Sequence, residues 1–271
     1  MRYLCVLTIA GSDSCGGAGV QADIKTMSAL GVYAASAITS VTVQNTLGVK
    51  AIQAIEPAFV AGQIKAVMDD VKPVAIKIGM VNDCATIHAI ADSLSSYSPS
   101  KLVVDPVMVS TSGSMLMQRD ALEVFCSELL PMATLLTPNI PEAEVLSKTE
   151  IHTIDDMDVA AKRILAMGCK AVLIKGGHLE GNKKIDKLYL QDGTVHTFVH
   201  ATVNTCNTHG TGCTLSSAIA SFMARGLDLP DAIAHAKEYL SQALEAGKDV
   251  EIGEGHGPVC HLFNPEKTII L

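Results

Sequence analysis

Short apolar runs recur along the chain, and segments with helical periodicity lie between them. Six of these runs are continuous rather than alternating, as expected of strands covered on both faces in a parallel sheet. They occupy residues 4–10, 34–43, 74–79, 102–105, 133–137 and 171–174. Residues 155–167 and 231–246 place their apolar positions on one helical face, and residues 215–224 form a helical run of small side chains. This alternation predicts an α/β fold whose mostly parallel sheet is flanked by helices.

One stretch departs from this alternation. Asp192-Gly193 stands between apolar residues at 189–190 and 195–199, a pattern that is typical of a β-hairpin. We therefore expect a small antiparallel part in the sheet. No low-complexity linker, internal repeat or charge block interrupts residues 1–271, which favours a single domain.

The composition indicates an aliphatic interior. Hydrophobic residues make up 48% of the chain and aromatic residues only 4%, and the mean hydropathy is +0.32. Such a chain is too apolar for disorder, and it lacks the aromatic platforms and basic grooves of single-stranded nucleic-acid binding. Its net charge of −8 gives no reason to expect nucleic acid or an anionic membrane as a partner.

The sequence also argues against a membrane or secreted protein. The longest uncharged stretch, residues 27–49, contains many Ser, Thr, Asn and Gln side chains that would be unpaired in hydrocarbon. The apolar N-terminus is predicted to be a buried strand rather than a signal peptide. The eight cysteines include no C-x-x-C pair, so we expect reduced thiols, no zinc site and a cytoplasmic location.

A glycine-rich loop at residues 11–19 follows the first predicted strand. Such a loop lets backbone amides approach a ligand closely. A P-loop would need Lys where Gly17 stands. A dinucleotide fingerprint would need an acidic residue about 20 positions further on, and none occurs between Asp23 and Glu56. An ordinary glycine-rich turn is the remaining alternative.

The segment at residues 207–214 carries a stronger signal. Gly210, Thr211 and Gly212 lead into a helix, where backbone amides and the helix dipole form an anion site. Cys213 lies in the first turn, so the same field predicts a lowered pKa for its thiol. A plain loop–helix joint with a buried cysteine is the alternative.

Polar side chains follow several other predicted strands. They are Asp105, with polar residues Thr111–Ser114 after it, then Asn139 with Glu142, and Lys175. The pair at 139 and 142 suits a metal or its waters, or else simple helix capping, and the lysine suits a phosphate or else solvent. Because parallel strands end at one edge, we expect these residues to gather there with Gly11 and Gly210–Cys213. The sequence therefore predicts a Mg-nucleotide site without a P-loop.

These motifs occur together in one known family. The chain resembles the hydroxymethylpyrimidine/phosphomethylpyrimidine kinases of thiamin synthesis, in the ribokinase-like superfamily. The matching segments run in the family's order nearly from end to end: residues 10–23, 43–46, 77–80, 104–108, 137–142, 175–178, 208–214 and 255–258. The resemblance implies a three-layer ribokinase-like sandwich, ATP and Mg²⁺ as cofactors, a small pyrimidine as substrate, and a homodimer.

The resemblance also implies roles for individual residues. The pyrimidine would be bound by Gly11, Asp23, Gln44, Met80 and Val107, and the amide of Gln44 suits an aminopyrimidine edge. Cys213 would be the base, with Gly210, Thr211 and Gly212 stabilising the transferring phosphoryl group. The nucleotide would be held by Asp105, Asn139, Lys175 and Thr208, and the metal by Glu142 and Asp105. This set is chemically sufficient for phosphoryl transfer, which depends mainly on positioning and electrostatics.

Some features leave alternatives open. The position of Cys206 is often basic in that family, so this loop is expected to offer a nucleotide less positive charge. His256 and the turn at 255–258 are expected to close the end of the chain rather than take part in catalysis. Pyridoxal kinase activity, a cysteine hydrolase that pairs Cys213 with His209 or His256, and a non-catalytic pyrimidine-binding regulator are the competing hypotheses. The shortage of aromatic residues predicts a pyrimidine site without an aromatic cage.

Overall fold

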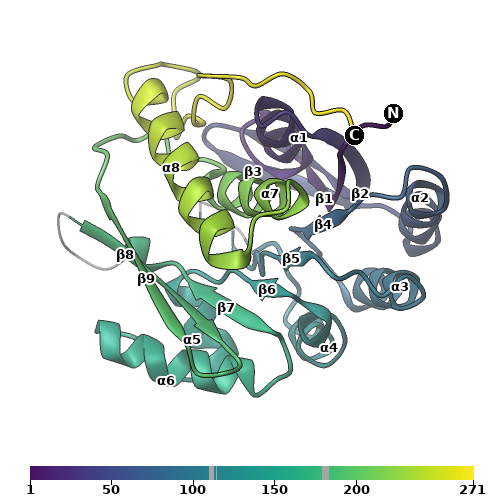
Figure 1. Cartoon of the computed structure of the whole chain (residues 1–271), viewed down its shortest axis with the longest axis horizontal. Helices are drawn as coiled ribbons and strands as arrows, with labels where there is room; N and C mark the ends of the chain where they lie inside the picture. Colours follow the sequence, from purple (N-terminus) through teal and green to yellow (C-terminus); the bar gives the residue numbers. More distant parts are fainter. Residues whose placement is uncertain (110–112, 114, 179–182) are drawn as a thin grey trace.

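A single sheet runs through the computed structural model, which describes residues 1–109, 113, 115–178 and 183–271. Of the expected polar stretch Thr111–Ser114, only Gly113 lies within the described residues. The strands that the described residues form pair in the order β3-β2-β1-β4-β5-β6-β7-β8-β9 (Figure 1). Their bounds are β1 Cys5–Ser12, β2 Tyr33–Asn45, β3 Gly48–Ala54, β4 Ala75–Ile78, β5 Leu102–Val104, β6 Leu135–Leu136, β7 Ala171–Ile174, β8 Lys183–Leu190 and β9 Val195–Ala201.

The centre of the sheet is parallel and its two edges are antiparallel. Strands β2, β1, β4, β5, β6 and β7 run in one direction, whereas β3, β8 and β9 pair antiparallel to their neighbours. The predicted hairpin is β8–β9, in which Tyr189 pairs with Val195. Gly193 supplies the positive φ of 87° that its turn requires. The predicted α/β fold with a mostly parallel sheet is therefore confirmed.

The region around β2 differs from the prediction. Residues 34–43 were expected to be buried on both faces, yet Val41 is 45% exposed and Val43 is 58% exposed. The second half of β2 pairs antiparallel with β3, a strand that the apolar pattern does not reveal. An antiparallel edge pair can leave one face in solvent, which accounts for the exposed valines.

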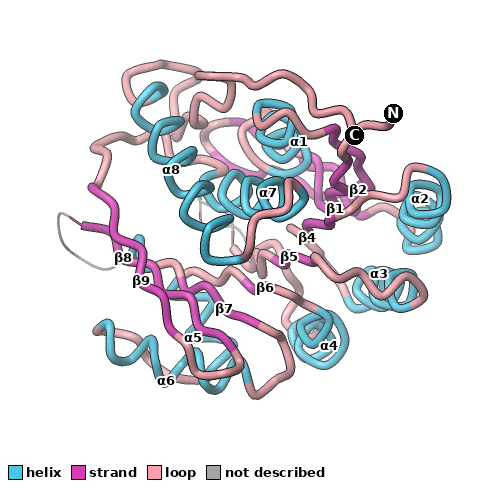
Figure 2. Tube along the Cα trace, in the orientation of Figure 1, coloured by secondary structure: helices cyan, strands magenta, loops and turns pink. Residues whose placement is uncertain are grey.

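Helices cover both faces of the sheet. Figure 1 shows α1, α7 and α8 on one side and α2 to α6 on the other, and Figure 2 shows the same layers by element type. The first layer contains α1 Gly19–Ala29, α7 Thr211–Ala224 and α8 Leu229–Gly247. The second contains α2 Pro57–Asp70, α3 Cys84–Ser95, α4 Ala121–Val124, α5 Ile140–Ser147 and α6 Ile154–Leu165. Short helical turns lie at η1 Phe125–Leu129, η2 Leu130–Met132 and η3 Gly176–His178. The three predicted helices are confirmed as α6, α8 and α7.

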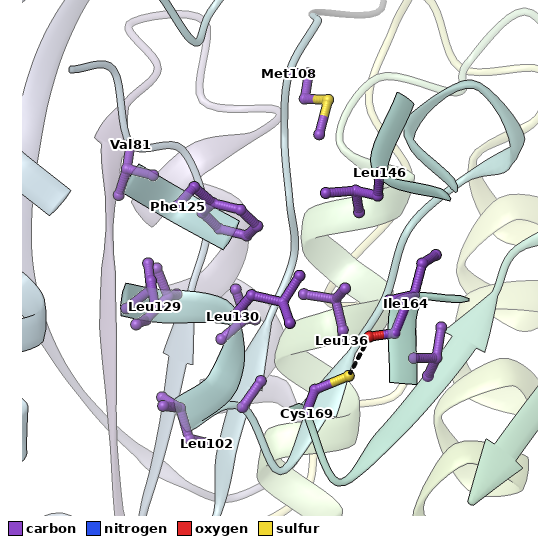
Figure 3. Close-up of a cluster of buried hydrophobic side chains, with 14 of the residues drawn as sticks. Val81, Leu102, Met108, Phe125, Leu129, Leu130, Leu136, Leu146, Ile164 and Cys169 are labelled. Atoms are coloured by element: carbon purple, nitrogen blue, oxygen red, sulfur yellow. Dashed lines mark hydrogen bonds between the residues drawn. The ribbon is translucent and has the colours of Figure 1, made fainter. Parts of the chain in front are cut away.

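Each face of the sheet has its own aliphatic core. On the α2–α6 side, Phe125, Leu130 and Leu136 pack with Ile164 (Figure 3). The thiol of Cys169 donates to the carbonyl oxygen of Ile164 at 3.8 Å in this core. On the other side, small residues of α7 pack against the sheet, so this helix lies close to the strands. Aliphatic packing on both faces thus accounts for the high hydropathy, and in the described part of the chain no helix is both long and apolar enough to cross a membrane.

Candidate active site

The parallel strands β1, β4, β5, β6 and β7 end at one edge of the sheet, and the first turn of α7 meets them there. The structure brings three of the expected residues into contact at this edge. Lys175 Nζ donates to Asp105 Oδ1 at 2.9 Å. A Cβ atom placed on Gly212 would lie 3.4 Å from Asp105 Oδ2 and 3.5 Å from Lys175 Nζ. The start of α7 therefore faces an ion pair formed by the ends of β5 and β7.

The anion loop, residues 207–213, is shaped by glycine. Gly210 has φ 79° and ψ 10°, a left-handed conformation, and a Cβ atom on it would lie 1.8 Å from the carbonyl oxygen of Gly17. Thr211 N donates to the carbonyl oxygen of Thr208, which closes the turn before the helix. The amides of the first turn of α7 then point out of a helix of 14 residues, with the positive end of its dipole behind them. This arrangement can bind a phosphate.

The Asp105–Lys175 pair is nearly closed to solvent. Burial alone would raise the pKa of Asp105, but the charges of Lys175 and Lys77 hold it below its usual range. Burial would lower the pKa of Lys175, but Asp105 and Glu142 raise it. Thr137 Oγ1 also donates to Asp105 Oδ1 at 2.9 Å. Both groups are therefore charged at neutral pH, so Lys175 can bind phosphate oxygens and Asp105 can bind a cation.

Asn139 and Glu142 form a capping box at the start of α5. Glu142 N donates to Asn139 Oδ1 at 2.9 Å, and Asn139 N donates to Glu142 Oε2 at 2.8 Å. The capping alternative is thus realised in this structure. Burial, with a further contribution from Asp105, raises the pKa of Glu142 to about 7, against the opposing charge of Lys175. A nearby cation would stabilise the ionised form of this carboxyl group.

The residues of this site suit magnesium that is bound together with phosphate oxygens, rather than magnesium held by side chains alone. Within the described residues, no cluster of three or more His, Cys, Asp or Glu side chains could hold a metal. Magnesium commonly binds through one or two carboxylates together with phosphate oxygens and water. Asp105 lies beside the anion loop, and Glu142 is near enough to Asp105 and Lys175 for their charges to act on it, so these two carboxylates suit a metal that arrives with a nucleotide.

The expected pKa of Cys213 is wrong. The dipole of α7 predicts a lowered value, but burial raises the pKa of this thiol to about 11. Lys77 and the Gly19 amide act in the opposite direction, while Asp23 and Asp105 raise it further. Removing the thiolate from water thus outweighs the nearby lysine and the Gly19 amide. The free protein holds Cys213 as a thiol.

Gly11, Met80 and Val107 lie at the same edge as the ion pair. A Cβ atom on Gly11 would lie 2.7 Å from Ser40 Oγ and 3.1 Å from Met80 Sδ, so the ends of β1, β2 and β4 pack without a gap. Thr39 Oγ1 donates to the carbonyl oxygen of Met80 at 2.8 Å and fixes this turn. Val107 N donates to the carbonyl oxygen of Asp105, next to the ion pair.

Asp23 lies beneath this region and forms a fully buried ion pair that the sequence did not reveal. Lys77 Nζ donates to both carboxylate oxygens, at 2.9 and 2.8 Å. Thr8 Oγ1 and Ser217 Oγ each donate to the same carboxylate at 2.6 Å. Four donor contacts thus occupy Asp23, and its contact with a ligand stays a prediction. The only signal for this pair is a lysine inside the apolar run of β4.

A second unexpected contact joins distant loops. His209 Nε2 lies 2.8 Å from Asp13 Oδ2 and 3.3 Å from Gln44 Nε2. His256 Nδ1 instead lies 3.0 Å from the carbonyl oxygen of Cys206, in the turn that covers the anion loop. Across the described ranges, no hydrogen bond joins Cys213 to either histidine, so the structure gives the cysteine hydrolase no support.

Comparison with known proteins agrees with this geometry. The family model described as phosphomethylpyrimidine kinase matches residues 13–260. The hydroxymethylpyrimidine/phosphomethylpyrimidine kinase of Rhizobium meliloti (strain 1021) is 48% identical over 257 residues, which cover 94% of this chain and 96% of that protein. The thiamine biosynthesis bifunctional protein ThiED of Geobacter sulfurreducens is 47% identical over 262 residues, 96% of this chain. The chain spans about half of that bifunctional protein, 53% of its length.

A solved structure extends the likeness to the fold. The ADP complex of Bacillus subtilis pyridoxal kinase superposes with a TM-score of 0.88 at 34% identity, covering 96% of this chain and 98% of that chain. This match agrees with the parallel sheet between two helical layers and confirms the expected ribokinase-like architecture. The family match and the close relatives give one conclusion: the chain belongs to the phosphomethylpyrimidine kinase family.

Proposed function

We propose that the chain is an ATP-dependent kinase that phosphorylates 4-amino-5-hydroxymethyl-2-methylpyrimidine and then its monophosphate, in thiamine biosynthesis. One observation carries the reaction type. The anion loop before α7 faces the Asp105–Lys175 ion pair, with Gly212 beside both side chains. The substrate is inferred from relatives that match nearly the whole chain, because they are named as kinases of this pyrimidine and its phosphate.

The transferred phosphoryl group would lie over the amides of Gly210, Thr211 and Gly212. Charge that develops on its oxygens would meet the helix dipole and the ammonium group of Lys175. Asp105 and Glu142 would hold magnesium, with Asn139 and Thr208 shaping the nucleotide side of the site. When bound, magnesium would neutralise phosphate charge and orient the phosphate oxygens.

Cys213 would take the proton of the substrate hydroxyl. The oxygen then attacks the γ-phosphorus, the bond to the β-phosphate oxygen breaks, and ADP leaves with that electron pair. Because the free thiol has a pKa of about 11, few molecules carry the thiolate at neutral pH. The rate should therefore rise with pH above 7. Cys213→Ala should lose turnover while it still binds ATP.

The pyrimidine would lie against Gly11, Met80 and Val107, with the amide of Gln44 on its aminopyrimidine edge. Asp23 would support the pyrimidine site from beneath through its ion pair with Lys77. It would contact the ligand directly where the ligand displaces one of its hydrogen-bond donors. Pyridoxal phosphorylation is the second candidate, since a pyridoxal kinase superposes closely on this chain. Parallel values of kcat/KM for the two alcohols discriminate between them.

We further propose a single cytoplasmic domain that forms a homodimer. The β2–β3 edge and the start of α2 support the dimer, because Val41, Val43, Leu47 and Phe59 are exposed there. A twofold contact could cover these side chains. Light scattering coupled to size-exclusion chromatography tests this: a dimer mass supports the proposal, and a monomer at micromolar concentration contradicts it.

The main experiment supplies MgATP with the hydroxymethylpyrimidine and follows products by mass spectrometry. We expect the monophosphate first and the diphosphate later. Lys175→Met should lower kcat/KM for ATP at least 100-fold, because it removes the phosphate-facing charge. Lys170→Met, at the opposite end of β7, is the matched control and should keep full activity. Efficient phosphorylation of pyridoxal with none of the pyrimidine would overturn the proposed substrate.

A further inference from the structure

Asp13 organises the glycine-rich loop and also contacts the anion loop. Its Oδ1 accepts from Cys15 N at 2.8 Å, and its Oδ2 accepts from Gly17 N at 3.0 Å and Ala18 N at 2.8 Å. His209 Nε2 lies 2.8 Å from the same Oδ2. Burial alone would raise the pKa of Asp13, but His209 and the amides of Ala18 and Cys15 hold it below its usual range. An ionised carboxylate accepts only, so His209 Nε2 carries the hydrogen of this contact.

The two loops touch at several further points. A Cβ atom on Gly17 would lie 2.5 Å from Cδ2 of His209, and one on Gly210 would lie 1.8 Å from the carbonyl oxygen of Gly17. His209 N donates to the carbonyl oxygen of Gly257 at 3.0 Å, which fixes the backbone just before Gly210. No space is left between the loops, so a shift of His209 must move the start of the anion site.

His209 also contacts the side chain proposed to recognise the pyrimidine. Gln44 Nε2 lies 3.3 Å from His209 Nε2. Since that nitrogen carries the hydrogen donated to Asp13, it has no lone pair for the amide NH₂, and the Nε2–Nε2 contact is a packing contact rather than a hydrogen bond. The Gln44 backbone is held by Ser14, whose Oγ accepts from Gln44 N at 2.9 Å. Gln44 Oε1 accepts from Thr42 Oγ1 at 3.2 Å, which holds the NH₂ group of the amide against His209. A ligand that turns the amide would break this bond and change the contact with His209.

We propose that Asp13 and His209 are positioning residues that couple the two substrate sites. A pyrimidine that hydrogen-bonds Gln44 fixes the orientation of its amide. The amide then fixes His209 against Asp13, and His209 fixes the anion loop that receives the nucleotide phosphates. Binding of the pyrimidine therefore increases the affinity for nucleotide, and by linkage nucleotide increases the affinity for pyrimidine by the same factor. This inference rests on the proposed function.

The experiment measures that factor by calorimetry. The Kd of the β,γ-methylene analogue of ATP with Mg²⁺ is determined without the hydroxymethylpyrimidine and with the pyrimidine at saturation. We expect about 5- to 10-fold tighter binding with the pyrimidine, the lower part of the usual range for coupled sites. In His209→Ala and Asp13→Asn the ratio should fall towards 1, while each ligand still binds alone. His256→Ala is the matched control in the adjacent turn, where the side chain contacts Cys206 instead, and it should keep the wild-type ratio.

Each other outcome has a defined meaning. A wild-type ratio near 1 overturns the coupling. A variant also overturns it if the nucleotide binds more weakly both with and without the pyrimidine while the ratio of the two Kd values stays at the wild-type value. That result indicates only a structural role. Complete loss of binding of either ligand also counts against positioning, and Asp13→Asn, which keeps the side-chain shape, serves if His209→Ala fails to fold. Failure of the wild-type protein to bind the pyrimidine at all would instead refute the proposed function.

Discussion

Alkylation of Cys213 tests how the site controls its proposed base. The pKa of about 11 implies that about one thiol in 1,000 is ionised at pH 8 and about one in 10 at pH 10. Iodoacetamide reacts with the thiolate, so the rate constant for Cys213 should rise about 100-fold over this interval without reaching a plateau. A thiol dominated by the helix dipole, with a pKa of 7 or below, would already react at its full rate at pH 8.

The assay is a labelling time course on the ligand-free protein, with peptides quantified by mass spectrometry. Exposed Cys206 reports the reagent's activity in the same sample, and Cys213→Ser identifies the peptide that must lose its label. Lys77→Met should slow labelling of Cys213 further, because it removes the positive charge that favours the thiolate. A plateau in the labelling rate by pH 8 would refute the reasoning that burial outweighs the helix field.

Three further predictions concern stability and the anion loop. Lys77→Met should lower the free energy of unfolding by about 3 kcal/mol, measured by urea denaturation, since it leaves the buried carboxylate of Asp23 without its cation. Adding Asp23→Asn should recover part of this loss. A cost below about 1 kcal/mol for Lys77→Met alone would contradict the prediction. Gly210→Ala should lower kcat/KM at least tenfold, because Gly210 is left-handed and the new Cβ would collide with the carbonyl oxygen of Gly17. Unchanged kinetics would contradict this, since they would show that the loop adapts. The raised pKa of Glu142, about 7, means that its ionisation opposes folding as the pH rises from about 4.5 to 7. In buffer free of divalent cations, the Tm of Glu142→Gln relative to wild type should therefore be higher at pH 8 than at pH 5. An equal difference at both pH values would contradict the raised pKa of Glu142.

The layout of the sheet follows from sequence rules that act locally. Continuous apolar runs predict β1 and β4 to β7, because strands covered on both faces have no polar alternation to show. The Asp192-Gly193 turn predicts the β8–β9 hairpin for an equally local reason. The gathering of Asp105, Lys175 and Gly212 then follows, since parallel strands end at a common edge.

The features that the sequence does not reveal depend on distant contacts or on burial. Strand β3 is mostly exposed and pairs only with the outer half of β2, so no apolar run marks it. The contact between Asp13 and His209 joins positions 196 residues apart. The pKa of Cys213 was mispredicted because a helix N-terminus is visible in the sequence, whereas the loss of water around a thiol in the folded chain is not.

The most direct test of the central claim is the single-turnover rate of phosphoryl transfer to the hydroxymethylpyrimidine, for wild type and Cys213→Ala, with enzyme in excess over MgATP. The wild-type protein should form the pyrimidine monophosphate and ADP in equal amounts. Cys213→Ala should bind the nucleotide with unchanged Kd and transfer the phosphoryl group at least 100-fold more slowly, the loss expected when a general base is removed. Absence of the pyrimidine phosphate with the wild-type protein, or an undiminished rate in Cys213→Ala, would contradict the account.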